Sequence, residues 1–352
     1  MKKNILTITA VIGLILSGCS KFETNLSFKQ SVEKNVAKIN DAAATIASSN
    51  GYQLITLSGD QAKSETGYAD SIKLDLIAGI YDYAPDTLFI PRMSCIPYKL
   101  FKKTGTSDKL IINMPQKVIF HPKYLFNFYH ADSAYNHNNF TITANDYHNY
   151  YTFADLFDYK LAAGFTLKKE DIGSLDLVSK ANRFTNRSYS SKFTFPKGYS
   201  IDVEFATGDT TTSSFALAED NSVLLKETNI FIGTEFNRMG ERQYLLTIGN
   251  VEIKKSTGID SIQVFLNDVL QKAAAVKIID SAASTGSIFH HRDLKLTFDD
   301  GTTTNLSNLI HPALSTLRSL TDSMNSMYFA KNIVDYIAYD IYYHQYKINF
   351  RP

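Results

Sequence analysis

The sequence predicts an α+β fold, in which a mainly antiparallel β-sheet is accompanied by an N-terminal amphipathic helix and by C-terminal helices. Two features carry this prediction. Apolar residues recur at helical spacing near both ends of the chain, from residue 28 and again from residue 314. Between these regions, apolar and polar residues alternate with a period of two, which is typical of half-buried antiparallel strands.

The N-terminal helix is predicted from an apolar stripe whose members follow at steps of three and four residues. They are Phe28, Val32, Val36, Ile39, Ala43 and Ile46. Charged residues occupy the other faces, and Asn50-Gly51 ends the pattern. Such a stripe has to be covered, and we expect the protein's own sheet to cover it, in preference to a membrane surface or a partner helix.

The strand pattern is clearest in residues 72–80, 201–205 and 294–298. In QYLLTIGNVEIKK, the phase of the alternation reverses around Gly249-Asn250, which predicts a β-bulge there. The segment SIQVFLNDVLQK predicts a hairpin that turns at Asn267-Asp268, although its apolar spacing also permits a short helix.

The C-terminal apolar pattern begins near Pro312, a suitable first residue of a helix, and fits either one bent helix or a helical hairpin. Its last part is rich in tyrosine, and Tyr336, Tyr339 and Tyr343 are candidate binding residues. An exposed tyrosine band would suit a sugar or a protein partner. The simpler alternative is that these rings cap the edge of the core with their hydroxyl groups in water.

The chain opens with MKKNILTITAVIGLILSGCSK, which has the arrangement of a secretory signal: two lysines, an apolar run and small residues before a cysteine. The apolar run is shorter than the roughly 20 residues of a membrane-spanning helix, and no later stretch reaches that length. We therefore expect the mature protein to have at most one attachment point, at its N-terminus.

The ending Leu16-Ser17-Gly18-Cys19 resembles the lipobox of bacterial lipoproteins. The resemblance covers residues 1–19 only, and the remainder resembles no family. It implies that the Cys19 thiol receives a diacylglycerol, that the signal is cut before this residue, and that the new amino group is acylated. Ser20 is not the aspartate that commonly retains such proteins at the inner membrane, so the resemblance implies the outer membrane, with the periplasmic side favoured over the cell surface.

The predicted organisation is a signal peptide at 1–18, a lipidated anchor and tether at 19–26, and two β-rich regions at 27–185 and 186–352, which form either two domains or one. Removal of the signal changes the formal charge from +1 to −1, so no global charge favours nucleic acid. Cys95 is the only other cysteine, and lipidation of Cys19 leaves no internal disulfide.

No catalytic residue, metal or other cofactor is predicted. His130, His137 and His148 are the nearest approach to a metal cluster, but spacings of seven and eleven fit no compact ligand motif, and a solvated loop explains them better. In IFHHRDLKL, His291 and Asp293 would share one face of a strand as an acid–base pair, although such residues are usually just solvated. The chain has no Gly-rich phosphate loop, Gly-x-Ser-x-Gly elbow or His-Glu-x-x-His helix.

The leading functional hypothesis is a lipid-anchored, non-enzymatic protein of the cell envelope, which binds a protein or glycan partner or supports an assembly at the outer membrane. The alternative is a periplasmic carrier of lipid or another apolar ligand, because a helix followed by a long antiparallel sheet looks like lipoprotein carriers in architecture alone. The third hypothesis is a hydrolase whose site is not visible in the sequence. A carrier requires a large apolar cavity, and a hydrolase requires convergent acidic or histidine side chains in a cleft.

Overall fold

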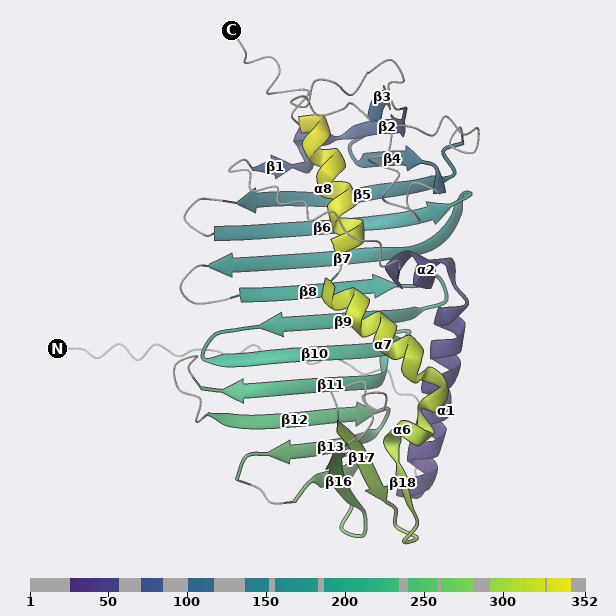
Figure 1. Cartoon of the computed structure of the whole chain (residues 1–352), viewed down its shortest axis with the longest axis vertical. Helices are drawn as coiled ribbons and strands as arrows, with labels where there is room; N and C mark the ends of the chain where they lie inside the picture. The colour runs from purple at the N-terminus through teal and green to yellow at the C-terminus, as the bar shows by residue number, and fades with distance from the viewer. Residues whose placement is uncertain are drawn as a thin grey trace, which may run out of the picture.

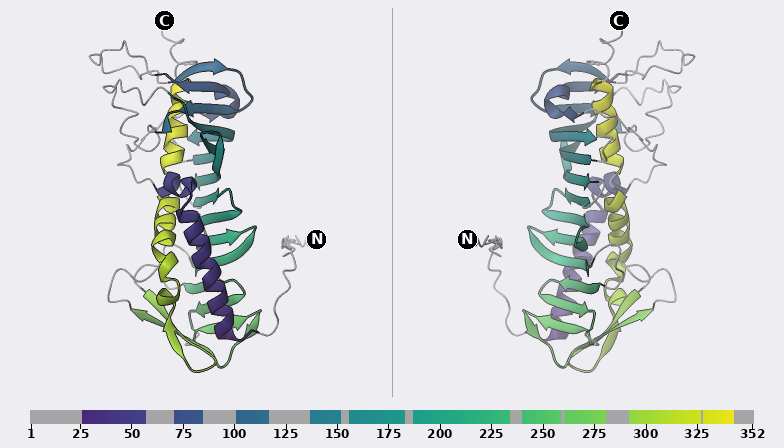
Figure 2. Two further views of the ribbon diagram at one scale, coloured as in Figure 1. Left: turned by 90° about the vertical axis from the view of Figure 1, so that its right-hand side faces the viewer. Right: turned by 90° about the vertical axis from the view of Figure 1, so that its left-hand side faces the viewer.

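The computed structural model describes residues 26–56, 71–84, 101–116, 137–151, 156–182, 187–233, 240–258, 261–280, 292–326 and 328–342. A long, mainly antiparallel sheet runs through these residues, and helices from both ends of the chain lie along one of its faces (Figures 1 and 2). The predicted α+β fold, with an N-terminal helix and C-terminal helices, is therefore confirmed.

Within the described residues, the main sheet has fifteen strands. They are β1 (Ile72–Lys73), β2 (Gly79–Tyr83), β3 (Phe101–Gly105), β4 (Leu110–Met114), β5 (Phe140–Tyr151), β6 (Leu156–Leu167), β7 (Glu170–Asn182), β8 (Arg187–Thr194), β9 (Tyr199–Ala206), β10 (Thr210–Glu219), β11 (Ser222–Ile232), β12 (Glu241–Ile248), β13 (Val251–Ser256), β14 (Gln263–Leu266) and β15 (Val269–Leu270). From β4 to β15 every strand pairs with the next one in the chain, so this part is a continuous meander. The meander crosses the boundary between 27–185 and 186–352, because β7 pairs with β8.

The two faces of the sheet differ in polarity, as the period of two requires. On β6, Leu161 is buried and lies opposite the buried Leu177 of β7, whereas Lys160 between the apolar positions is exposed. The Lys160 ammonium forms an ion pair with the carboxylate of Asp146 on β5, at 2.6 Å. We call the apolar side the helix face and the polar side the open face, because the described helices all lie on the former (Figure 2).

Six described helices belong to this layer: α1 (Phe28–Ala47), α2 (Asn50–Thr56), α3 (Leu74–Ile77), α6 (Leu306–Leu309), α7 (His311–Ser326) and α8 (Tyr328–Tyr342). Helix α1 packs against α7 and against β11, β12 and β13. Helices α7 and α8 follow one another along the sheet, as a bent helix would, and do not fold back as a hairpin (Figure 1).

The amphipathic stripe of α1 is buried as predicted. All six of its members, Phe28, Val32, Val36, Ile39, Ala43 and Ile46, are at most 4% exposed. The helix begins with a capping box, in which the Ser27 hydroxyl accepts the Gln30 backbone N–H at 3.3 Å and the Gln30 side chain accepts the Ser27 N–H at 3.0 Å. It ends at Ala47, and Asn50-Gly51 opens the short helix α2, where the sequence predicted only an end.

A separate sheet of three strands, β16 (Ala275–Asp280), β17 (Arg292–Thr297) and β18 (Thr303–Asn305), lies at one end of the molecule. It is tied to the start of α1, because the rings of Phe28 and Phe298 lie 5.6 Å apart. The Lys29 ammonium also contacts the Asp300 carboxylate at 2.8 Å and holds the pKa of that carboxyl below its usual range. The first turn of α1 therefore contacts the small sheet, which also packs against α6 and β14.

Two local predictions for the strand-rich region were wrong. Residues 72–80 do not form one strand, because the short helix α3 separates β1 from β2 and packs against α8. Gly249-Asn250 is a two-residue turn and not a bulge, because Ile248 pairs directly with Val251. Directly paired residues share a face, which produces the reversal of phase in the sequence.

The hairpin at Asn267-Asp268 is confirmed. Leu266 pairs with Val269, and both turn residues have positive φ, 47° and 63°. Asn and Asp tolerate this conformation better than most residues do. No helix among the described residues has the length and apolar character needed to cross a membrane.

The packing of α1 makes a prediction about stability. Ile39→Ala should lower the free energy of unfolding by about 2–5 kcal/mol, because it leaves a cavity under a fully buried side chain. The neighbouring exposed Lys38→Ala is the control and should change it by no more than about 0.5 kcal/mol. Urea unfolding measures both, and equal effects of the two variants would contradict the placement of this stripe.

Candidate functional site

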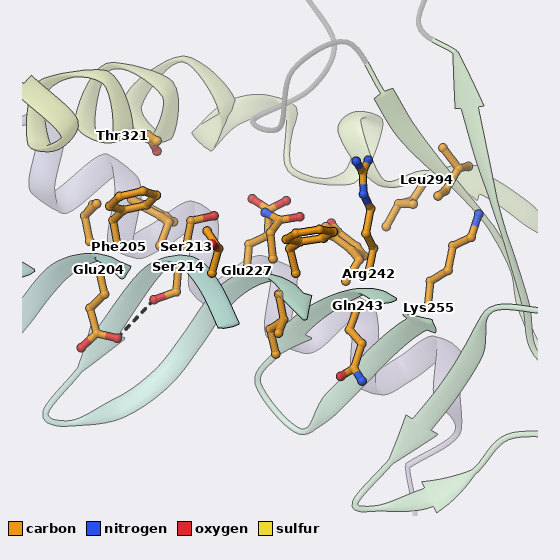
Figure 3. A pocket seen from close by; sticks show the side chains of 18 of the residues that line it. Glu204, Phe205, Ser213, Ser214, Glu227, Arg242, Gln243, Lys255, Leu294 and Thr321 are labelled. Carbon is orange, nitrogen blue, oxygen red and sulfur yellow. Dashed lines mark hydrogen bonds between the residues drawn. The ribbon is translucent and has the colours of Figure 1, made fainter. Parts of the chain in front are cut away.

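A cleft of about 1050 Å³ lies on the helix face, between strands β8–β13 and a second layer formed by the small sheet, α6 and α7 (Figure 3). The second layer contributes Ile278 from β16, Leu294 from β17, Leu306 from α6 and Thr321 from α7. This volume is at the upper end of the range of small-molecule sites, roughly 300–1,000 Å³. The cleft is therefore large enough for a ligand of substantial size.

Aromatic and aliphatic side chains make up much of the cleft surface. Phe205 of β9 points into the cleft and is 39% exposed, although it lies on the apolar face of the sheet (Figure 3). Val203, Phe215 and Phe231 lie on the same face of neighbouring strands. In a filled core, a phenylalanine ring on the apolar face of the sheet would be covered by other side chains. The exposure of the Phe205 ring therefore shows that apolar surface in the cleft is left uncovered.

The local sequence explains why a cleft opens here. Successive side chains of a strand point to opposite faces of the sheet, so Glu204 and Ser214 point to the open face. There the Ser214 hydroxyl donates a hydrogen bond to the Glu204 carboxylate at 3.3 Å (Figure 3). The adjacent Phe205 and Ser213 face the cleft and lie directly opposite each other. Small or polar side chains at such positions, including Ser213 and Asn229, replace the Leu and Phe that fill the helix face elsewhere.

Glu227 of β11 is a buried ionisable group of the cleft, with 7% of its surface exposed. The register places it between Phe215 of β10 and Leu246 of β12, which are both buried. Its side chain hydrogen-bonds to those of Tyr244 and Asn229. Burial raises the pKa of the Glu227 carboxyl to about 8, and these two hydrogen bonds offset only part of that effect.

Two cations lie nearer the rim of the cleft. Arg242 of β12 and Lys255 of β13 are exposed and point from the sheet toward the second layer (Figure 3). The Arg242 guanidinium lies 5.7 Å from the centre of the Phe231 ring. Within the part of the chain that the structure describes, neither cation forms an ion pair with Glu227.

Asp293 is a second acid whose side chain lies in the cleft, and it holds two elements of the second layer together. Its carboxylate accepts hydrogen bonds from the backbone N–H groups of Leu294, at 2.8 Å, and of Ser307, at 3.1 Å. The Ser307 hydroxyl donates a third, at 2.5 Å. These contacts join β17 to α6, and His291, the partner suggested for Asp293 by the sequence, lies outside the described residues.

The two histidine candidates that the structure describes, His137 and His148, do not form a common site. His137 is exposed just before β5, and His148 is half-buried on the open face of β5, opposite Lys160. His130 lies outside the described residues. No group of three His, Cys, Asp or Glu side chains that could hold a metal occurs among the residues that the structure describes.

Two of the tyrosine candidates, Tyr336 and Tyr339, lie on α8, and neither is among the residues that line the cleft. Tyr336 and Tyr339 are half-buried and pack against the hydrophobic core. Burial, together with the nearby Asp340, raises the pKa of Tyr336. Tyr343 and Cys19 lie outside the described residues.

The sequence contained a signal for Glu227 that the analysis of motifs missed. In VLLKETNIFI, the apolar phase of the strand passes through Leu225, Glu227, Asn229 and Phe231. An acid in the buried phase of a strand is unusual, because most buried positions are apolar. Its importance became visible only when the register placed it opposite Phe215 and Leu246.

Comparison with known proteins provides no analogue for this arrangement. No protein family, no curated protein and no solved structure matches the chain. The functional interpretation therefore depends on the chemistry of the cleft and on the N-terminal sequence.

The raised pKa of Glu227 predicts how stability depends on pH. The unfolded carboxyl titrates near 4.5, so between about pH 4.5 and 8 the folded state retains a proton that the unfolded state has lost. The stabilisation associated with this proton is complete below that range and is lost as the pH rises through it. From pH 5 to pH 8 the free energy of unfolding of the wild type should fall by roughly 3–4 kcal/mol relative to that of Glu227→Gln.

Urea unfolding at pH 5, 6.5 and 8 measures this difference. Glu252→Gln, which changes a half-exposed acid on β13, is the matched control and should follow the wild type. Parallel pH profiles of the wild type and Glu227→Gln would contradict the assigned burial of this carboxyl.

Proposed function

We propose that this protein is a lipid-anchored protein of the bacterial cell envelope that binds an apolar or amphipathic small molecule in the cleft. The observation that carries the binding role is the cleft itself, with its exposed Phe205 and its deep carboxyl Glu227. Large, mainly apolar sites with few polar groups are the usual form of small-molecule sites. The anchoring role rests on Cys19 and the lipobox around it.

The chemistry of the cleft favours binding over hydrolysis. Acid–base hydrolysis of a glycosidic bond uses two carboxyl groups that both reach the substrate. Asp293 is engaged by three donors that tie β17 to α6, and the carboxylate of Glu204 points to the open face (Figure 3). Glu227 is therefore the acid of the cleft that is available to a ligand. A binding role requires only one such group.

The same surface favours a small ligand over a protein assembly. The aromatic residue Phe205 faces inward, toward the second layer, where a large partner would not reach it without displacing α7 or the small sheet (Figure 3). The proposed function therefore combines the binding role of the leading hypothesis with the apolar ligand of the alternative hypothesis, the carrier.

The anchor and the cleft lie toward the same end of the molecule under this proposal. Phe28 is nine positions after Cys19, so the lipidated cysteine would lie within about 30 Å of the start of α1. Phe28 contacts Phe298, which directly follows β17, and Leu294 of β17 lines the cleft. A ligand that partitions into the outer membrane would therefore have a short path to the site.

The anchoring role predicts that Cys19→Ala moves the protein from the membrane fraction to the soluble fraction, because the variant lacks the thiol that accepts the lipid. Ser17→Thr, which keeps the cysteine, is the control for a change in the same segment. Fractionation, followed by mass spectrometry of the N-terminal peptide, measures the result. A Cys19→Ala protein that stays entirely with the membranes would contradict the anchor.

The binding role predicts that blocking the cleft prevents binding. Ser213→Phe places a second ring opposite Phe205 and should weaken the binding of the neutral apolar probe N-phenyl-1-naphthylamine at least tenfold, about 1.4 kcal/mol. Ser214→Phe changes the next residue, whose side chain points to the open face, and should bind the probe within twofold of the wild type (Figure 3). Fluorescence titration gives both affinities, and equal binding by the two variants would refute this site.

A further inference from the structure

We propose that the ligand of the cleft carries a protonated amine that pairs with the Glu227 carboxylate, and an apolar body that lies against Phe205 and its aromatic neighbours. This inference rests on the proposed function, because it names the chemical class of ligand for that site.

The position of Glu227 calls for a cationic partner. Only 7% of the Glu227 surface is exposed and the residue lies between Phe215 and Leu246, so its carboxyl has lost most of its hydration. Its side-chain partners, Tyr244 and Asn229, are neutral. A buried carboxylate is normally paired with a cation or held neutral, because neutral hydrogen bonds compensate only part of its lost solvation.

The protein's own cations near the cleft are placed elsewhere. Arg242 lies opposite Phe231, four residues along β11 from Glu227, which corresponds to about 13 Å of extended strand. Lys255 is on β13, two strands away from β11, or about 10 Å across the sheet. Among the described residues, neither forms an ion pair with Glu227, so the charged form of this carboxyl gains a cationic partner only when the ligand brings one.

The other polar groups that face the cleft have partners or are neutral. The Tyr189 hydroxyl of β8 donates to the backbone carbonyl of Met324, at 2.8 Å, and Asp293 of β17 is engaged by Ser307 and two backbone N–H groups. Helix α7 contributes the hydroxyl of Thr321. Arg242 and Lys255 lie near the rim. Within the described cleft, Glu227 is therefore the ionisable group with which a charged group of the ligand can form an ion pair.

An amine would also change the protonation of Glu227, which makes the inference measurable. With a pKa of about 8, the free carboxyl is mostly protonated at pH 7. An ammonium group stabilises the carboxylate form, so binding at pH 7 should release about 0.9 proton per ligand. A neutral ligand of the same shape has no such effect and releases none.

The test compares three ten-carbon ligands, decylamine, decanol and decanoic acid, at pH 7 and below their aggregation concentrations. Isothermal titration calorimetry of the Cys19→Ala chain in two buffers of different ionisation enthalpy gives affinity and proton release. We expect decylamine to bind at least tenfold more tightly than decanol, with release of close to one proton. Glu227→Gln should bind decylamine and decanol equally, release no proton, and still bind N-phenyl-1-naphthylamine, which shows that its cleft is intact.

The outcomes separate this inference from the proposed function. Equal affinities of the wild type for decylamine and decanol would overturn the amine and leave the apolar site in place. Tightest binding of decanoic acid, lost in Arg242→Gln, would also overturn it and would assign the ligand charge to the rim. Failure of all three ligands and of the neutral probe to bind the wild type would overturn the proposed function as well.

Discussion

The apolar helix face of the main sheet has to be covered over its whole length, and this requirement shapes the rest of the structure. A meander of consecutive strands buries little surface by itself, because its strands form one layer. The cover comes from the two ends of the chain: α1 lies against β11, β12 and β13, while α7 and α8 extend along the sheet past β9 to β1 (Figure 1). Helices from distant parts of the sequence therefore hold one layer together.

The cleft lies where this cover stands away from the sheet. Between α7 and the small sheet on one side and strands β8–β13 on the other, the helix face carries small and polar residues such as Ser213 and Asn229. A fold that maximised stability would place apolar residues there, and a carboxyl between Phe215 and Leu246 lowers stability at neutral pH. Groups that weaken a fold at one place commonly serve a function there, which is the reason to regard Glu227 as part of a binding site.

The sequence predicted those features that depend on local patterns. The stripe of α1 repeats over five turns and defines its buried face, and Asn267-Asp268 between apolar residues specifies a tight turn. Residues 72–80 were misread because alternation over a few residues does not distinguish a strand from a short helix flanked by strands. The two-residue turn at Gly249-Asn250 was misread because a reversal of phase has the same appearance in a bulge and in a hairpin.

The cleft could not be predicted from motifs, because its residues come from six strands of the main sheet, the small sheet and two helices. Only the register brings Glu227 beside Tyr244, and only the tertiary fold places Thr321 of α7 above Phe205 (Figure 3). The alternation of β11 would have shown an acid in a buried phase, but without its neighbours such an acid is equally consistent with an edge strand. The candidates that the sequence did offer, His148 and Tyr336 among them, lie elsewhere on the fold.

A crystal structure of the protein purified from its own membranes, without any step that strips bound lipid, would show whether the cleft holds a ligand. We expect continuous density for an elongated apolar molecule in the cleft, in contact with Phe205 and with a polar atom within hydrogen-bonding distance of the Glu227 carboxyl. A cleft that contains only ordered water, or in which protein side chains fill the space beside Phe205 and Glu227, would contradict the claim that this space is a ligand site.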